Sequence, residues 1–182
     1  MMSGRATLAS DRDILEARAR TIARRPDASA DDPTLEVLTF SLSQERFAVE
    51  PRFVHRIVAL PVVTVVPGVS KAFLGVVNLH GNIVPVADLG FLLNIPARPR
   101  LDSTCHAIVL GHERYELALV AETLGNIHEI AFAAPAHAPE SPLMQFITND
   151  AVIVLSAEAI LTDGRLTTSL LASHSNPVGE SL

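Results

Sequence analysis

Cysteine, aromatic residues and long apolar runs are all scarce in this sequence. Cys105 is the only cysteine among 182 residues, which excludes an internal disulfide or a cysteine-based metal cluster and is typical of a reducing compartment. Aromatic residues make up 4% of the chain, so a core has to be built mainly from Val, Leu, Ile and Ala. No apolar run approaches the ~18 residues of a membrane-spanning helix, and charges stand where a signal peptide is apolar. We therefore expect a cytoplasmic protein without membrane insertion.

Motifs for catalysis and metal binding are missing as well. None of the seven histidines has H-x-H or H-x3-H spacing on an expected helix, and no phosphate-binding glycine loop or G-x-S-x-G elbow occurs. Cys105 and His106 are adjacent, and neighbours on a strand point to opposite faces, so they cannot form a nucleophile–base pair. The net charge of −6 argues against nonspecific binding of nucleic acid. These absences predict no enzyme, no metal site and no cofactor.

The stretch from residue 73 to 93, FLGVVNLHGNIVPVADLGFLL, predicts a β-hairpin followed by a short helix. Gly81-Asn82 is a two-residue loop with glycine first, which is typical of a type II′ turn. The expected cross-strand pairs are His80 with Ile83, Leu79 with Val84, Asn78 with Pro85, and Val77 with Val86. Because side chains alternate along a strand, Val77, Leu79, Val84 and Val86 then face the core, and Asn78, His80 and Pro85 face outward. One side of the hairpin is a candidate contact surface.

Two further positions define the surroundings of this hairpin. Pro85 cannot donate to a strand ladder, so its strand is expected at a sheet edge or at a bulge. Asp88 stands directly before LGFLL, where a helix cap is favoured over a lone general base. Arg56, on the strand that begins at Val54, is either a solvated charge or part of a contact surface with Asn78 and His80.

Composition divides the chain into three regions. Residues 1–34 are expected to be an arm: an Arg-rich helix over 10–25, either solvated or partner-binding, and a Pro- and Asp-rich linker over 26–33. Residues 35–165 contain many short strands with turn signals about every ten residues, which predicts a mainly β, barrel-like architecture. The Pro- and Arg-containing connection at 94–102 is the expected boundary between its two halves. The polar tail over 166–182 is expected to be disordered.

Three stretches together resemble the CheW-like domain of bacterial chemosensory adaptors. These are FSLSQERFAVEPRFVHRIV, then TVVP over 64–67, then FLGVVNLHGNIVPVADL. The resemblance implies two intertwined five-stranded β-barrel subdomains and a non-catalytic adaptor, recruited from the cytoplasm to membrane receptor arrays. Its implied partners are the regulatory domain of a CheA-type histidine kinase, the chemoreceptor cytoplasmic tip and other CheW-like domains. The expected partner-binding residues are Val54, Arg56, Asn78, His80, Gly81 and Pro85, and the expected structural residues are Val77, Leu79, Gly81, Asn82, Val84, Val86 and Asp88.

Two positions depart from the pattern of that family. Arg56 stands where the family has a glutamate, and His80 stands where it has an arginine. If the family residues pair as opposite charges, this chain replaces that attraction with a cation and an imidazole, which repel once the imidazole is protonated. An alternative function is therefore a divergent module that has lost standard kinase coupling and serves as a structural or inhibitory partner.

Overall fold

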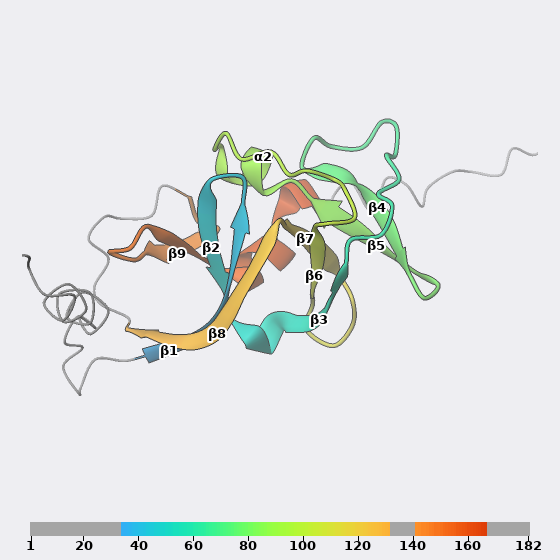
Figure 1. Ribbon diagram of the computed structural model, residues 1–182. Coiled ribbons are helices and arrows are strands. Elements are labelled where there is room, and N and C mark those ends of the chain that lie inside the picture. Colours follow the sequence, from blue (N-terminus) through green and yellow to red (C-terminus); the bar gives the residue numbers. More distant parts are fainter. Residues whose placement is uncertain (1–33, 132–140, 167–182) are drawn as a thin grey trace, which may run out of the picture. The chain divides into compact units, whose positions relative to one another are not determined.

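The computed structural model describes residues 34–131 and 141–166, which form ten strands and three short helices (Figure 1). The elements are β1 (Thr34–Leu42), β2 (Glu45–Val49), η1 (Pro51–Phe53), β3 (Val54–Ala59), β4 (Phe73–Leu79), β5 (Asn82–Ala87), α2 (Leu89–Leu93), β6 (His106–Leu110), β7 (Leu117–Ala121), β8 (Thr123–Ala131), β9 (Met144–Ile147), β10 (Val152–Leu155) and α3 (Ala157–Leu161). The helix expected over 10–25, its linker and residues 167–182 of the tail lie outside the described residues. No helix in the described part is long and apolar enough to cross a membrane.

The strands form two five-stranded sheets, as the resemblance implies. Sheet A has the order β8-β1-β2-β10-β9, and sheet B has the order β3-β6-β7-β5-β4. The chain leaves sheet A after β2, completes sheet B, and returns to sheet A at β8. The boundary expected at 94–102 is wrong, because this connection joins α2 to β6 and sheet B has strands on both sides of it. The chain passes between the sheets at residues 50–53 and again at Glu122.

The β4–β5 hairpin forms with a register that differs by two residues from the expected one. Leu79 pairs with Asn82, Asn78 with Ile83, and Val77 with Val84. The loop is therefore His80-Gly81, with φ of 54° and 91°, and not Gly81-Asn82. Positive φ at both central residues is the signature of a type I′ turn, whose twist matches that of the flanking strands. A shift of two residues keeps each side chain on its face, so Val77, Leu79, Val84 and Val86 are buried as the alternation predicts.

Pro85 lies neither on an edge strand nor at the bulge of the hairpin, which corrects that expectation. Strand β5 is flanked by β4 and β7, and the bulge is opposite, between Phe73 and Gly75 on β4. Pro85 pairs with Val76, whose N–H and C=O both bond to Thr64 on the other side, at 2.9 and 2.8 Å. The Val76–Pro85 pair therefore needs no N–H from Pro85, and the proline is tolerated inside the sheet.

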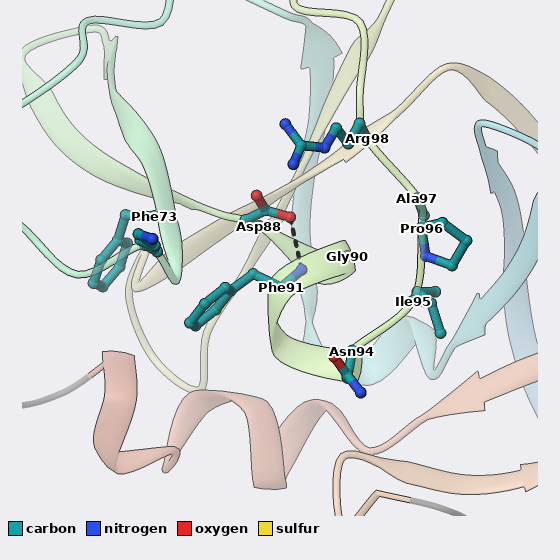
Figure 2. Close-up of a pocket in the computed structure, with 10 residues that line it drawn as sticks. Phe73, Asp88, Gly90, Phe91, Asn94, Ile95, Pro96, Ala97 and Arg98 are labelled. Atoms are coloured by element: carbon teal, nitrogen blue, oxygen red, sulfur yellow. Dashed lines mark hydrogen bonds between the residues drawn. The ribbon is translucent and has the colours of Figure 1, made fainter.

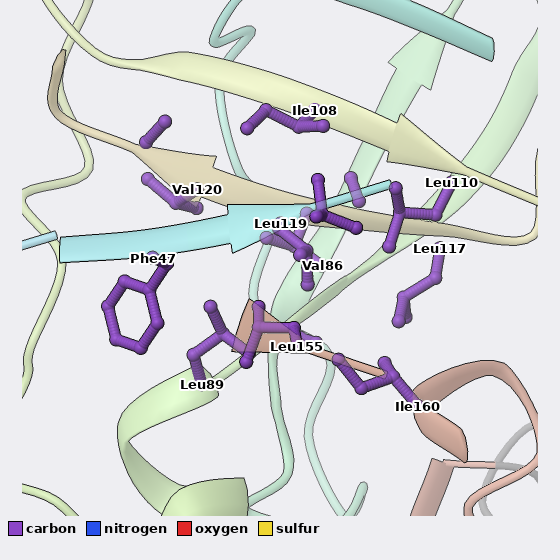
Figure 3. Close-up of a cluster of buried hydrophobic side chains, with 14 of the residues drawn as sticks. Phe47, Val86, Leu89, Ile108, Leu110, Leu117, Leu119, Val120, Leu155 and Ile160 are labelled. Carbon is purple, nitrogen blue, oxygen red and sulfur yellow. The ribbon is translucent and has the colours of Figure 1, made fainter. Parts of the chain in front are cut away.

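One apolar cluster joins the two sheets and fixes their relation. Figure 3 shows side chains from sheet A, including Phe47 and Leu155, meeting Val86 and Leu119 of sheet B. Leu89 of α2 packs into the same cluster. The cluster is almost entirely aliphatic, as the shortage of aromatic residues requires. Leu166 also belongs to it and is 3% exposed, so the expected tail begins one residue too early.

Candidate interaction surface

The tip of the β4–β5 hairpin is held by its own side chains. Asn78 Oδ1 accepts a hydrogen bond from Gly81 N at 2.7 Å, and Asn82 Nδ2 donates to Leu79 O at 3.3 Å. Both bonds close the two-residue loop, and Gly81 supplies the positive φ that the turn requires. The structure therefore assigns Asn78 and Asn82 a turn-stabilising role, and the exposed tip is held in one conformation before any partner arrives.

Arg56 and His80 are brought together although 24 positions separate them in the sequence. Arg56 Nη1 lies 3.2 Å from His80 Nδ1, and both residues are exposed. A β-bulge between Val54 and Arg56 inserts one extra residue into β3 just before this contact. Because a guanidinium is always a donor, the imidazole accepts at Nδ1 in this contact. Arg56 and His80 are therefore joined by a hydrogen bond and not by an ion pair of opposite charges.

The contact between β3 and the hairpin depends on the segment that follows β3. Thr64 pairs with Val76 of β4 through hydrogen bonds in both directions. A Cβ on Gly75 would overlap the carbonyl oxygen of Thr64, and Gly75 has a φ of 149°. Glycine at position 75 is therefore what lets this segment close against β4, and Val62 stands two residues before the bridge at Thr64.

Two apolar side chains that the sequence interpretation did not single out stand on this surface. Val62 is 88% exposed and Ile83 is 63% exposed. Ile83 is the cross-strand partner of Asn78, so both project from the same face of the hairpin. Its signal was present in the alternation, because Ile83 has the same parity as Asn78 and His80 across the hairpin, which the sequence analysis expects to face outward. We call Arg56, Val62, Asn78, His80 and Ile83 the hairpin surface.

The remaining expected residues fall in different places. Val54 is half-buried at the start of β3, and Gly81 is exposed at the hairpin tip. Pro85 is buried in the domain, so its expected place on an outward contact surface is wrong. Asp88 caps α2, since its Oδ1 accepts a hydrogen bond from Phe91 N at 3.0 Å. Of the expected partner-binding residues, those at the tip of the β4–β5 hairpin and on β3 therefore remain candidates.

The described residues offer no alternative site of metal or thiol chemistry. No group of three or more His, Cys, Asp or Glu side chains in 34–131 and 141–166 could hold a metal ion. Cys105 is 1% exposed and its thiol donates to Arg100 O at 3.0 Å. A buried thiol of this kind behaves as a small apolar side chain. The hairpin surface is thus the part of the described chain that the expected residues converge on.

Comparison with known proteins identifies the family of this fold. The family model of the CheW-like domain matches residues 36–165. The chain belongs to the CheW-like domain family. A chemotaxis protein CheW of Bacillus subtilis (strain 168) is 27% identical over 105 residues, covering 58% of this chain and 67% of that protein. The crystal structure of the scaffolding protein TtCheW from Thermoanaerobacter tengcongensis matches with a TM-score of 0.56 at 20% identity, covering 68% of this chain and 90% of that one.

The matched range of the CheW-like domain contains the elements described here, apart from the first two residues of β1. It begins within β1 and ends after α3, so it includes both sheets and the cluster between them. The structural match at 20% identity supports the fold, and the family match covers the hairpin surface as well. Arg56 and His80, the two positions at which the sequence analysis expects a departure from the family pattern, meet at the hairpin tip.

Proposed function

We propose that this CheW-like chain is a non-catalytic adaptor that couples chemoreceptor cytoplasmic tips to a CheA-type histidine kinase through protein–protein contacts. The observation that carries the proposal is the hairpin surface, an exposed set of two apolar side chains, an arginine and two polar groups in and around a fixed turn. The names of the relatives, a chemotaxis protein and a scaffolding protein, agree with an assembly role. Other CheW-like domains are partners of the same kind.

The composition of the hairpin surface suits a binding site. Exposed aliphatic side chains next to an arginine are typical of interface cores, where a few residues carry most of the binding free energy. The turn is already closed by Asn78 and Asn82, so little conformational entropy is lost when a partner binds. A rigid, partly apolar tip is therefore a better docking element than a loop of the same length.

The test measures binding of the purified chain to the regulatory domain of a CheA-type kinase and to a receptor tip fragment. We expect association with at least one of them at tens of micromolar or tighter, and Ile83→Asp should weaken it about tenfold. Ile127→Asp is the matched control, because Ile127 is 55% exposed but lies on β8 in sheet A. The proposal is contradicted if the chain binds neither partner, or if the two substitutions weaken binding equally.

A second candidate function rests on the Arg56–His80 contact. This pair contains no negative charge, whereas the family pattern has a glutamate and an arginine at these positions. The alternative is a divergent module that has lost standard kinase coupling and acts as a structural or inhibitory partner. It predicts that the double substitution Arg56→Glu with His80→Arg strengthens binding to the kinase domain. An unchanged or weaker affinity of the double variant eliminates this alternative.

A further inference from the structure

A pocket of about 670 Å³ lies at the other end of the β4–β5 hairpin, beside α2 (Figure 2). It is lined by Phe73 and Lys71 at the start of the hairpin, by α2, and by the segment 94–98. Phe73 and His80 are separated by the length of β4, about 20 Å at the rise of an extended strand. The pocket is therefore separate from the hairpin surface.

The walls of the pocket are held by hydrogen bonds from several parts of the chain. Asp88 N donates to Ala72 O at 2.8 Å, which ties the two ends of the hairpin together. Ile95 N donates to Gly90 O at 3.0 Å and folds the segment after α2 back onto the helix. Ser43 Oγ donates to Arg98 O at 2.8 Å, which anchors the far wall to sheet A. These hydrogen bonds hold the backbone segments that line the pocket.

Phe91 gives the pocket an apolar side. It is 44% exposed, and it is the one phenylalanine among the described residues that is exposed. Figure 2 shows its ring pointing away from α2 on the side of Phe73, whereas Ile95 and Pro96 lie on the other side of that helix. In a chain with 4% aromatic residues, an exposed phenylalanine beside a preformed cavity marks a site for an apolar side chain of a partner.

Lys71 and Arg98 give the pocket a positive rim on a chain whose net charge is −6. Neither side chain forms an ion pair or hydrogen bond with the residues that the structure describes. Asp88 is the one carboxylate in the lining, and its Oδ1 is engaged by Phe91 N. Two unpaired cations next to an apolar wall are complementary to a carboxylate that stands beside a bulky aliphatic side chain.

We propose that this pocket is a second docking site, which binds a segment of another protein that carries a leucine-type side chain next to an aspartate or glutamate. The aliphatic side chain packs against the ring of Phe91, and the carboxylate meets Lys71 and Arg98. Because the pocket and the hairpin surface are at opposite ends of one hairpin, both can be occupied at once. The chain then has two separate contact points within sheet B and its helix, which is what a scaffold requires. This inference goes beyond the proposed function and does not depend on it.

The experiment uses three short synthetic peptides with a fluorescent label and the full chain. The first peptide repeats leucine and glutamate, the second has lysine in place of glutamate, and the third has alanine in place of leucine. We expect the leucine–glutamate peptide to bind at about 100 micromolar or tighter, and the other two to bind about tenfold more weakly or not at all. If the lysine peptide binds as tightly as the leucine–glutamate peptide, charge does not contribute to binding. If the alanine peptide binds as tightly, the pocket recognises only the negative charge. Either result, or no binding of the first peptide, overturns the proposal.

Variants of the chain locate the binding. Lys71→Glu and Arg98→Glu should each weaken the leucine–glutamate peptide about fivefold to tenfold, and Phe91→Ala about tenfold. Arg114→Glu is the matched charge control, because Arg114 is exposed in the loop between β6 and β7 and outside the pocket lining. Ile127→Ala is the matched apolar control on β8. If the controls weaken binding as much as the pocket variants, the peptide binds elsewhere and the proposal fails.

Discussion

Arg56 donates a hydrogen bond from Nη1 to Nδ1 of His80 over 3.2 Å, which joins β3 to the turn of the β4–β5 hairpin. A guanidinium has no acceptor atom, so the imidazole accepts at Nδ1. The contact links two segments that lie 24 positions apart in the sequence and places a cation at the hairpin tip.

Arg56→Ala removes the donor of this contact and should loosen the link between β3 and the hairpin turn. Amide chemical shifts of Gly81 and Asn82, which are distant from position 56 in the sequence, are expected to change, followed by NMR. His55→Ala is the control, since His55 is the neighbouring residue on β3 but packs against Tyr115 at 5.9 Å between ring centres. Equal shift changes at Gly81 and Asn82 in the two variants contradict the prediction.

Gly75→Ala should lower the free energy of unfolding by about 3 kcal/mol or more, because its Cβ overlaps Thr64 O and its φ of 149° disfavours a side chain. The measurement is urea unfolding followed by circular dichroism. Gly68→Ala is the matched control, since Gly68 also has a positive φ, of 80°, but nothing lies within 4 Å of its Cβ. It should cost about 1 kcal/mol, the strain of the backbone conformation alone. Equal losses in the two variants rule out the close approach at Thr64 as the cause.

The faces of the hairpin could be predicted from the sequence, whereas its register could not. Alternation identifies Val77, Leu79, Val84 and Val86 as inward-facing, and they are buried. A shift of two residues leaves this alternation intact, so the apolar pattern cannot distinguish Gly81-Asn82 from His80-Gly81 as the loop. The structure resolves this through φ of 54° at His80, a conformation that non-glycine residues rarely adopt and that the side chain of Asn78 supports from outside the loop.

Long-range features of the fold could not be predicted from local sequence patterns. Strand β10 pairs in parallel with β2 across about a hundred positions, and this pairing places residues 152–155 in the interior of sheet A. No local signal marks 94–102 as a connection within a sheet, which is why it was mistaken for a boundary. The candidate site shows the same limit: Arg56 and His80 are adjacent because Thr64 closes against Val76, a contact between distant residues.

A buried carboxylate links the end of β2 to β9. Glu50 is 7% exposed, and its Oε1 accepts a hydrogen bond from Gln145 Nε2 at 3.0 Å, while Oε2 lies 2.8 Å from Arg52 Nε. Glu50→Ala should lower the free energy of unfolding by about 2 kcal/mol, because Gln145 is left without its partner. A double-mutant cycle with Gln145→Ala should give a coupling of about 1 kcal/mol. Fully additive effects show that the two side chains do not stabilise each other.

Asp163 and Arg165 form an ion pair with Nη2 to Oδ2 at 2.7 Å, where the chain after α3 meets α2. Hydrogen bonds from the Arg165 side chain hold the pKa of Asp163 below its ordinary value of 3.8. Arg165 Nη1 also donates to Leu92 O at 3.1 Å, so the pair helps to fix the guanidinium against α2. Because the pKa in the folded state is lower than in the unfolded chain, the stabilisation is present at neutral pH and is lost as the pH falls through the folded-state pKa.

Asp163→Asn should therefore lower the free energy of unfolding by about 1 kcal/mol at pH 7 and by progressively less toward pH 3. Urea unfolding of both proteins at a series of pH values measures this difference. Asp150→Asn is the control, because Asp150 is exposed in the loop between β9 and β10, and no hydrogen bond to its carboxylate occurs within the described residues. Its effect should be small at every pH. A difference between wild type and Asp163→Asn that does not shrink on acidification shows that the lost stability comes from packing and not from the charge of Asp163.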